Sequence, residues 1–244
     1  MFIDFLTTLP PESILCFKVL LCGLFVLASF RFLGLGGLYM YTIVATLAAN
    51  LAVLKQVQFA FHPHPIAVGT VIFTSLFLCS DVINEYYGKK AALKNIYLGF
   101  GGYFIFSTLI FMVMGYQTQT PLTDEALKWL FVPAPIFLVS SLTAYFISQY
   151  TDVLIYRFIY QKTGKAYLWA RALGSTVCSS FLDNTIFSLL AWYVLSPSPL
   201  PLQTIFWTYI LGASVLRVIL SFVNTGFMCL TPYLKPKDLK NNVL

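Results

Sequence analysis

The chain has 244 residues, of which 59% are hydrophobic and only 10% are charged, and its formal net charge is +6. Soluble domains carry about 25% charged residues, so this composition excludes an ordinary water-soluble domain and indicates an integral membrane protein. The positive charge does not indicate a nucleic-acid surface, because the basic residues fall in short loops between apolar stretches.

Seven apolar stretches are long enough to form spanning helices, which need about 20 mostly apolar residues. The first is read as a retained helix and not as a signal peptide, because Lys18 and Arg31 lie within it and no small-residue cleavage site ends it. We therefore predict one transmembrane domain over residues 1–244 with a short cytoplasmic tail at 231–244. The predicted spans are 14–33, 37–57, 65–87, 94–116, 133–160, 171–195 and 204–230.

The distribution of lysine and arginine predicts the orientation of these helices. With the N-terminus outside and the C-terminus in the cytoplasm, eleven loop cations lie inside and two, Lys55 and Lys128, lie outside. The acidic pair Asp124 and Glu125 also falls outside. An alternative has six helices, with 14–33 lying along the membrane surface or outside the bundle.

The loop between the fourth and fifth predicted helices contains a short amphipathic stretch at 120–131. Thr123 is a candidate cap, and Leu127, Leu130 and Phe131 give the stretch an apolar side. It is interpreted either as an external interfacial helix or lid, or as an ordered loop.

Motifs for metal binding and catalysis are absent from the sequence. The five cysteines lie inside apolar stretches without metal-ligand spacing, and His62 and His64 are the only histidines, separated by a proline. Walker A, GxSxG and HExxH patterns do not occur. We therefore expect no metal, no cofactor and no enzymatic activity.

The most informative stretch is Asp81–Lys90, where a nearly pure apolar run ends in two carboxylates and then two lysines. Asp81, Asn84 and Glu85 have i, i+3, i+4 spacing, so they share one face of a continuing helix. A carboxylate at membrane depth is costly unless it faces protein or water. This face is therefore a candidate functional site.

Other predicted helices also carry a polar face within an apolar sequence. Lipid excludes unpaired polar groups, so these faces are expected to converge inside the bundle. The polar positions are Asn50 in the second helix, Gln149 and Asp152 in the fifth, Thr176, Ser179, Ser180 and Asp183 in the sixth, and Arg217, Ser221 and Asn224 in the seventh.

Each polar face can also be explained by contacts that hold the helices together, without any role in function. The hydroxyl positions Thr176, Ser179, Ser180 and Ser221 favour helix–helix hydrogen bonding. Asp183 and Arg217 either form a buried ion pair that holds the last two helices together or line a substrate or proton pathway. Glu85 and Asp152, nearer the cytoplasmic side, are either satisfied by loop lysines or belong to the same pathway.

Several of these motifs resemble the queuosine-precursor transporters of the YhhQ-like vitamin uptake family. The matching segments are Asn50 to Lys55, Pro65, the run Asp81–Lys89, Ser148 to Val153 with Gln149 and Asp152, Leu168 to Arg171, Ser175 with Thr176, and Asp183. The resemblance covers about residues 40 to 230. Arg217, Asn224 and Gly226 depart from its pattern in the last helix.

The resemblance implies an all-α bundle whose six-helix core is similar to the substrate-binding S-components of energy-coupling-factor transporters, with one extra N-terminal transmembrane helix. It also implies a 7-deazaguanine substrate, queuine or a pre-queuosine base, imported across the bacterial inner membrane. A carboxylate accepts the two adjacent N–H donors of a guanine-like edge, and aromatic side chains stack on the bicyclic base.

We therefore predict a multi-pass carrier for a queuosine precursor, without nucleic-acid contact. The alternatives are a substrate-binding subunit that needs a partner ATPase module, and a membrane enzyme or scaffold without cargo. The predicted substrate contacts are first Asp81, Glu85, Asp152 and Asp183, and then Asn50, Asn84, Gln149, Arg217 and Asn224.

Overall fold

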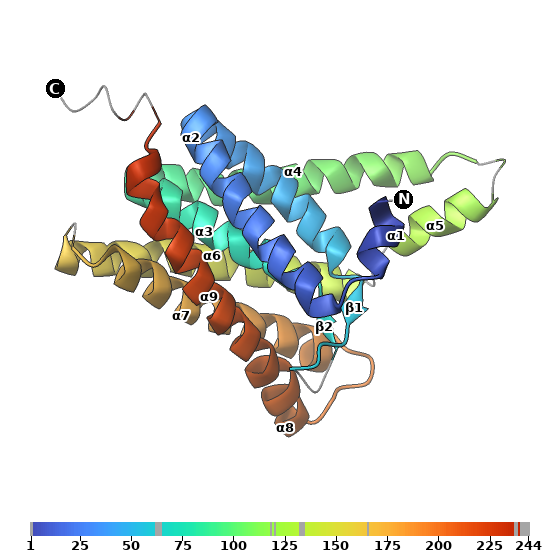
Figure 1. Cartoon of the computed structure of the whole chain (residues 1–244). Coiled ribbons are helices and arrows are strands. Elements are labelled where there is room, and N and C mark those ends of the chain that lie inside the picture. The colour runs from blue at the N-terminus through green and yellow to red at the C-terminus, as the bar shows by residue number, and fades with distance from the viewer. Residues whose placement is uncertain are drawn as a thin grey trace.

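The computed structural model describes residues 2–61, 65–117, 119, 121–131, 135–164, 166–236 and 239, and these residues are mostly helical (Figure 1). The long helices pack into one bundle whose apolar core joins α2, α3, α4, α6, α7 and α9. The helices are α1 (Phe2–Thr7), α2 (Pro11–Ala52), α3 (Thr70–Tyr86), α4 (Lys89–Met114), α5 (Pro121–Phe131), α6 (Pro135–Thr163), α7 (Leu168–Leu189), α8 (Leu202–Thr204) and α9 (Ala213–Leu230).

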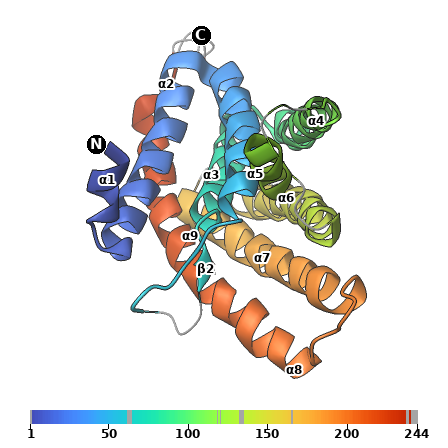
Figure 2. The same cartoon turned by 90° about the vertical axis from the view of Figure 1, so that its right-hand side faces the viewer.

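Helix α2 consists of two arms that meet at a sharp bend, which Figure 2 shows as an inverted V. The bend lies at Gly34, whose φ of 57° and ψ of −137° are outside the helical range and favour glycine. The first arm packs inside the bundle, because Val26 and Phe30 are buried in the core and the ring of Phe227 lies directly against Gly23. The alternative that leaves residues 14–33 outside the bundle is therefore wrong.

A short antiparallel hairpin of strands β1 (Gln56–Val57) and β2 (Ile66–Ala67) lies between α2 and α3. The register pairs Gln56 with Ala67 and Val57 with Ile66. Residues 56, 57, 66 and 67 were expected to extend the neighbouring helices, and they form strands instead. The hairpin lies near the end of the second arm of α2, away from the Gly34 bend (Figure 2).

The last two long helices contain wider, π-helical stretches near the loop that joins them. They are η1 (Leu190–Val194), which continues α7, and η2 (Ile205–Gly212), which leads from α8 into α9. The rings of Trp192 and Tyr209 lie 5.0 Å apart between these stretches. The 3₁₀ turn η3 (Thr231–Leu234) directly follows α9.

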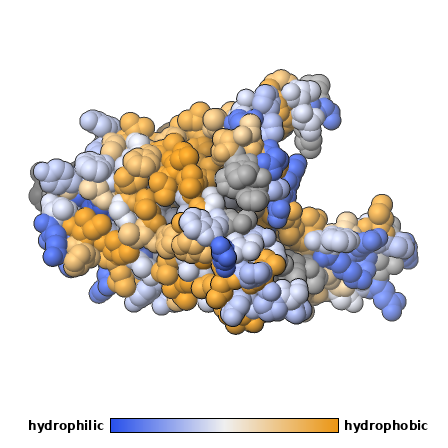
Figure 3. Space-filling model, turned by 90° about the horizontal axis from the view of Figure 1, so that it is seen from below, coloured by the Kyte–Doolittle hydropathy of each residue, from blue (hydrophilic) through white to orange (hydrophobic). Residues whose placement is uncertain are grey.

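Large apolar side chains cover much of the outer surface, as the face in Figure 3 shows. On α4, Phe104 and Met112 are 64% and 68% exposed, an arrangement suited to contact with lipid tails. Among the described residues, four helical segments are long and apolar enough to cross a membrane: Pro11–Ala52, Lys89–Met114, Leu168–Val194 and Leu202–Leu234. The protein is therefore a helical, multi-pass membrane protein.

Basic residues gather where the Gly34 bend, the α3–α4 turn and the α6–α7 turn lie close to the start of the C-terminal tail. Arg31 Nη1 donates to the carbonyl of Lys235 at 3.2 Å, and Lys235 and Lys94 lie over the rings of Tyr86 and Tyr39. We call this the basic end of the bundle. The hairpin, α5 and the loop between η1 and α8 belong to the other end (Figure 1).

Candidate functional site

The polar faces of α3, α6 and α7 meet in the middle of the bundle. Asp81 on α3 and Asp152 on α6 are 2% and 0% exposed, although a soluble protein almost never buries such groups unpaired. Hydroxyl groups of α7 donate to both of them: Thr176 Oγ1 to Asp81 Oδ2 at 3.3 Å and Ser179 Oγ to Asp152 Oδ1 at 2.8 Å. The expected helix–helix hydrogen bonds are thereby confirmed for Thr176 and Ser179. They are not found for the other two hydroxyls: Ser221 donates to the carbonyl of Arg217 within α9, and Ser180 Oγ has no partner among the described residues.

The two carboxyl groups lie beside each other, because both face one stretch of α7, where Thr176 binds Asp81 and Ser179 binds Asp152. Asp81 Oδ1 also faces the hydroxyl of Ser175 at 3.5 Å, a weak contact. Among the described residues, no N–H or hydroxyl group donates to Asp152 Oδ2, which is buried. We call Asp81 and Asp152 the carboxyl pair.

Asn84 and Gln149 flank the carboxyl pair, each one turn from one of its members. Asn84 is 0% exposed, and its Nδ2 donates to the carbonyl of Val153 at 3.2 Å. Its Oδ1 accepts from no donor in the described part of the chain. Gln149 is 2% exposed on α6. The region between α3 and α6 therefore holds buried acceptors that a ligand with N–H groups would satisfy.

Asp183 and Arg217 form the expected ion pair between α7 and α9, through Arg217 Nη1 and Asp183 Oδ2. Ser148 on α6 donates to Asp183 Oδ1 at 3.0 Å. The carboxylate of Asp183 is thus compensated by a cation and a hydroxyl group. Its first role in this structure is to hold α6, α7 and α9 together.

Glu85 is held by Arg171, which the sequence analysis counted among the cytoplasmic loop cations and in the family-like segment Leu168 to Arg171, but not as a partner of Glu85. The guanidinium donates to both carboxylate oxygens, Nε to Oε2 at 2.9 Å and Nη2 to Oε1 at 2.7 Å. Tyr156 adds a hydroxyl donor to Oε2 at 2.8 Å. Arg171 is 1% exposed and also binds the carbonyls of Gly164 and Ala166. An arginine, and not a loop lysine, therefore satisfies Glu85 at the basic end.

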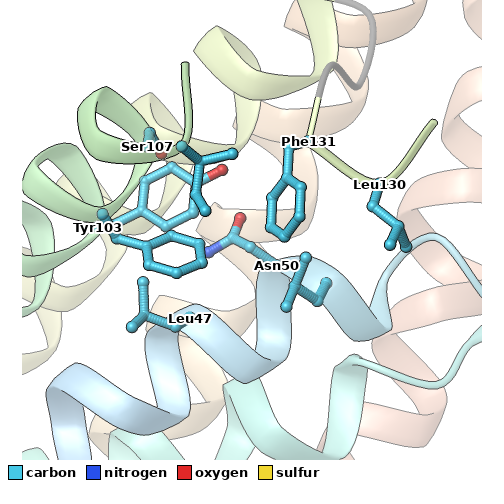
Figure 4. A pocket seen from close by; sticks show the side chains of 9 residues that line it. Leu47, Asn50, Tyr103, Ser107, Leu130 and Phe131 are labelled. Carbon is cyan, nitrogen blue, oxygen red and sulfur yellow. The ribbon is translucent and has the colours of Figure 1, made fainter. Parts of the chain in front are cut away.

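Asn50 lies at the other end, beneath α5, in the small cavity of Figure 4. Its amide Nδ2 donates to Thr46 and its Oδ1 accepts from Ser141 on α6 at 3.3 Å. The amide points into a space between the rings of Tyr103 and Phe131 (Figure 4). The free volume is about 20 Å³, enough for about one water molecule. The cavity is closed to a bicyclic base in this conformation.

The amphipathic helix expected at 120–131 is confirmed as α5. It begins at Pro121, so Thr123 lies inside its first turn and is not the cap. Lys128 and Asp124 pair one turn apart at 2.7 Å. Phe131 and Leu130 form the side of α5 that covers the cavity (Figure 4). The position of α5 fits the lid interpretation.

Asn224, the remaining predicted contact, bridges α9 and α3 through Nδ2 and the carbonyl of Thr74 at 2.9 Å. A cavity of about 380 Å³ lies between α7 and α9, but Phe181 in its wall is 42% exposed and Val177 and Val218 make it apolar. His62 and His64 lie outside the described residues. The polar convergence is therefore centred on α3, α6 and α7.

Helix α6 connects all of these groups along one face. From the lid toward the basic end, it presents Ser141 to Asn50, Ser148 to Asp183, Asp152 to Asp81 and Tyr156 to Glu85. These positions are separated by seven, four and four residues, which places them on one side of a helix. The bundle therefore contains a line of polar side chains that runs from beneath α5 to the basic end.

The profile of the family described as "Putative vitamin uptake transporter" matches residues 67–231, which include the carboxyl pair and both ion pairs. The chain belongs to this family. A protein of Bacillus subtilis (strain 168) named "Probable queuosine precursor transporter" is 30% identical over 216 residues, covering 86% of this chain and 92% of the relative. No solved structure matches the chain.

Membership of the vitamin uptake transporter family identifies the chain as a transporter and not an enzyme. The family match begins at Ala67, so both arms of α2, including Asn50, lie outside the matched region. The similarity to S-components of energy-coupling-factor transporters stays a prediction.

Proposed function

We propose that the protein imports a queuosine precursor, queuine or a pre-queuosine 7-deazaguanine base, across the bacterial cytoplasmic membrane. The relative from Bacillus subtilis carries this substrate in its name. The structural observation that supports the substrate class is the pair of buried acceptors without a donor, Asp152 Oδ2 and Asn84 Oδ1, beside Asp81. These two oxygens have no hydrogen-bond donor among the described residues, and a ligand with several N–H groups would supply one to each.

The chemistry of a 7-deazaguanine fits this site. Its guanine-like edge offers two adjacent N–H donors to a carboxylate, and its aminomethyl nitrogen is cationic. We assign the base edge and the amine to Asp81 and Asp152, with Asn84 and Gln149 as neutral partners. Glu85 and Asp183 already have arginine partners, so in this proposal they shape the site without taking the first contact.

The route into the site begins beneath the lid. The cavity under α5 has the aromatic walls that a flat base stacks on, Tyr103, Phe106 and Phe131, and one amide, Asn50. Because this cavity is closed, the base enters only when α5 and α4 separate. The basic end is assigned to the cytoplasm, with the N-terminus outside.

The test is uptake of labelled queuine and of labelled aminomethyl-7-deazaguanine into cells that lack their own importer. The wild-type chain restores uptake, and Asp152→Asn abolishes it while the protein stays in the membrane. Glu125→Gln on α5, an exposed acid changed in the same way, keeps uptake. Correctly inserted protein that takes up neither base would overturn the substrate assignment.

Binding and energy supply are separated by two further measurements. The bases raise the thermal unfolding temperature of purified protein, whereas guanine does not, because a ligand stabilises the state that binds it. Transport by the purified chain alone in liposomes identifies a self-sufficient carrier. Binding without transport in liposomes would instead favour a subunit that needs a partner ATPase module.

A further inference from the structure

Among the described residues no cation binds the carboxyl pair, whereas Glu85 and Asp183 each have an arginine partner. Arg171 is bound by both oxygens of Glu85, and Arg217 is bound to Asp183. Asp81 and Asp152 face each other and the hydroxyls of α7. Two carboxylates in contact at membrane depth repel each other and are both desolvated, so they cannot both stay ionised without a cation.

Among the described residues, the other cations of the packed helices lie away from the pair: Arg31 donates to the carbonyl of Lys235, Lys162 lies over Phe158, and Lys89 and Lys90 are exposed. Lys18 on α2 donates to the carbonyl of Val68, Lys94 on α4 lies over Tyr39, and Arg157 on α6 lies over Tyr160. The neutral titratable groups are Tyr156, which binds Glu85, together with Tyr145 on α6 and Cys79 on α3. None of these side chains supplies a positive charge to the pair.

From this arrangement we propose that the carboxyl pair is a proton-binding site, and that one proton enters the cell with each molecule of base. The proton sits on Asp81 and is donated to Asp152, whose Oδ2 has no donor among the described residues and keeps a second lone pair for an N–H group of the base.

Charge balance links the proton to the substrate, and this step rests on the proposed function. A base with a cationic amine leaves a fully ionised pair with one uncompensated negative charge. A proton on Asp81 makes the loaded site neutral, which is the state that crosses the apolar interior at the lowest cost. The proton comes from the outer solution and leaves the pair with the base at the basic end, where water that enters the open site hydrates both carboxylates.

The first experiment reconstitutes the purified full chain in liposomes and measures accumulation of labelled aminomethyl-7-deazaguanine. With the membrane potential clamped at zero and the outside one pH unit more acidic, accumulation rises about tenfold for one proton per base. Asp81→Asn, whose amide can still donate to Asp152, keeps the fold but loses this response. Glu125→Gln on α5 keeps it.

The second experiment detects the proton without any substrate. The infrared spectrum of the solubilised protein at neutral pH contains the C=O band of a protonated carboxyl group, and this band disappears in the double variant Asp81→Asn with Asp152→Asn and remains in Glu125→Gln. The same samples show unchanged helical circular dichroism, so loss of the band reports the proton and not unfolding.

The outcomes separate this proposal from the proposed function. If accumulation of the base does not depend on the pH gradient, or depends on a Na⁺ gradient instead, proton coupling is overturned. The substrate assignment is unaffected by that result. If neither base is transported, the proposed function fails, and the infrared band alone decides the proton site. Absence of the band in the wild-type chain overturns it.

Discussion

Arg171 and Glu85 form a two-point ion pair across α7 and α3, with N–O distances of 2.9 and 2.7 Å. The pair ties the start of α7 to the end of α3, and Arg171 also binds the carbonyls of the α6–α7 turn. It therefore fixes three helices at the basic end. Such two-point geometry is specific to arginine.

Removing the arginine should destabilise the folded protein strongly. Arg171→Gln leaves Glu85 buried without its cation, so we expect a loss of about 3–5 kcal/mol in the free energy of unfolding. Thermal unfolding in detergent measures the loss. Glu85→Gln combined with Arg171→Gln recovers part of it, because no uncompensated charge remains. Equal stability of the single and double variants would contradict this role of the pair.

The ion pair of Asp183 and Arg217 gives a second prediction. Asp183→Asn leaves a cation without a partner between α7 and α9, so the amount of folded protein in the membrane falls. The double variant Asp183→Asn with Arg217→Gln restores folded protein, as measured by detergent extraction and size-exclusion profile. If Asp183→Asn stays fully folded and only loses uptake, Asp183 acts on the transport pathway and not mainly as a helix tether.

The bend in α2 depends on one glycine. Gly34→Ala forces a side chain into a backbone conformation with φ of 57° and ψ of −137°, at a cost of about 1–3 kcal/mol. The matched control is Gly36→Ala, two residues away, where an added Cβ meets nothing within 4 Å. We expect a lower unfolding temperature for the first variant only. Similar unfolding temperatures for both variants would count against a required bend at Gly34.

The cavity beneath α5 gives a prediction about affinity. If the base stacks on Tyr103 during entry, Tyr103→Ala raises the KM for uptake by roughly 2–10-fold, from a stacking contribution of about 0.5–1.5 kcal/mol. Tyr116, which is 78% exposed just after α4, serves as the control, and Tyr116→Ala leaves KM unchanged. A change in maximal rate without a change in KM would argue for a role in lid motion.

The orientation can be measured with a membrane-impermeant maleimide on intact cells. In a variant whose five cysteines are replaced by serine, a cysteine at Glu125 on α5 is labelled, whereas one at Lys162 near the end of α6 is labelled only after the cells are opened. The reverse pattern would invert the predicted topology.

The polar faces were predictable from the sequence because helical periodicity is local. Asp81 and Asn84, or Gln149 and Asp152, lie one turn apart whatever the tertiary structure. Membrane exclusion of polar groups then predicts that such faces meet. The choice of partners was not predictable, because Thr176 reaches Asp81 across 95 residues and Arg171 reaches Glu85 across 86.

Arg171 shows why a site residue was missed. Near the start of a helix and close to loop lysines, it matched the pattern of a cytoplasmic anchor, and nothing in its neighbours marks it as buried. The hairpin was missed for a related reason. Apolar residues such as Val57 and Ile66 give the same hydropathy signal whether they continue a helix or form a strand. The pairing of β1 with β2 is decided by tertiary contact, which the local sequence does not show.

Helices α3 and α6, which carry the carboxyl pair, are absent from the four segments that are apolar and long enough to cross a membrane by themselves. An aspartate at the centre of a lone helix adds about 2.5–3.5 kcal/mol to its insertion from the translocon. Each of these helices therefore enters the bilayer poorly as a separate unit. Since α3 packs against α2 and α6 against α7, we expect each to insert more readily beside that neighbour, so the carboxyl pair also bears on how the membrane takes up the chain.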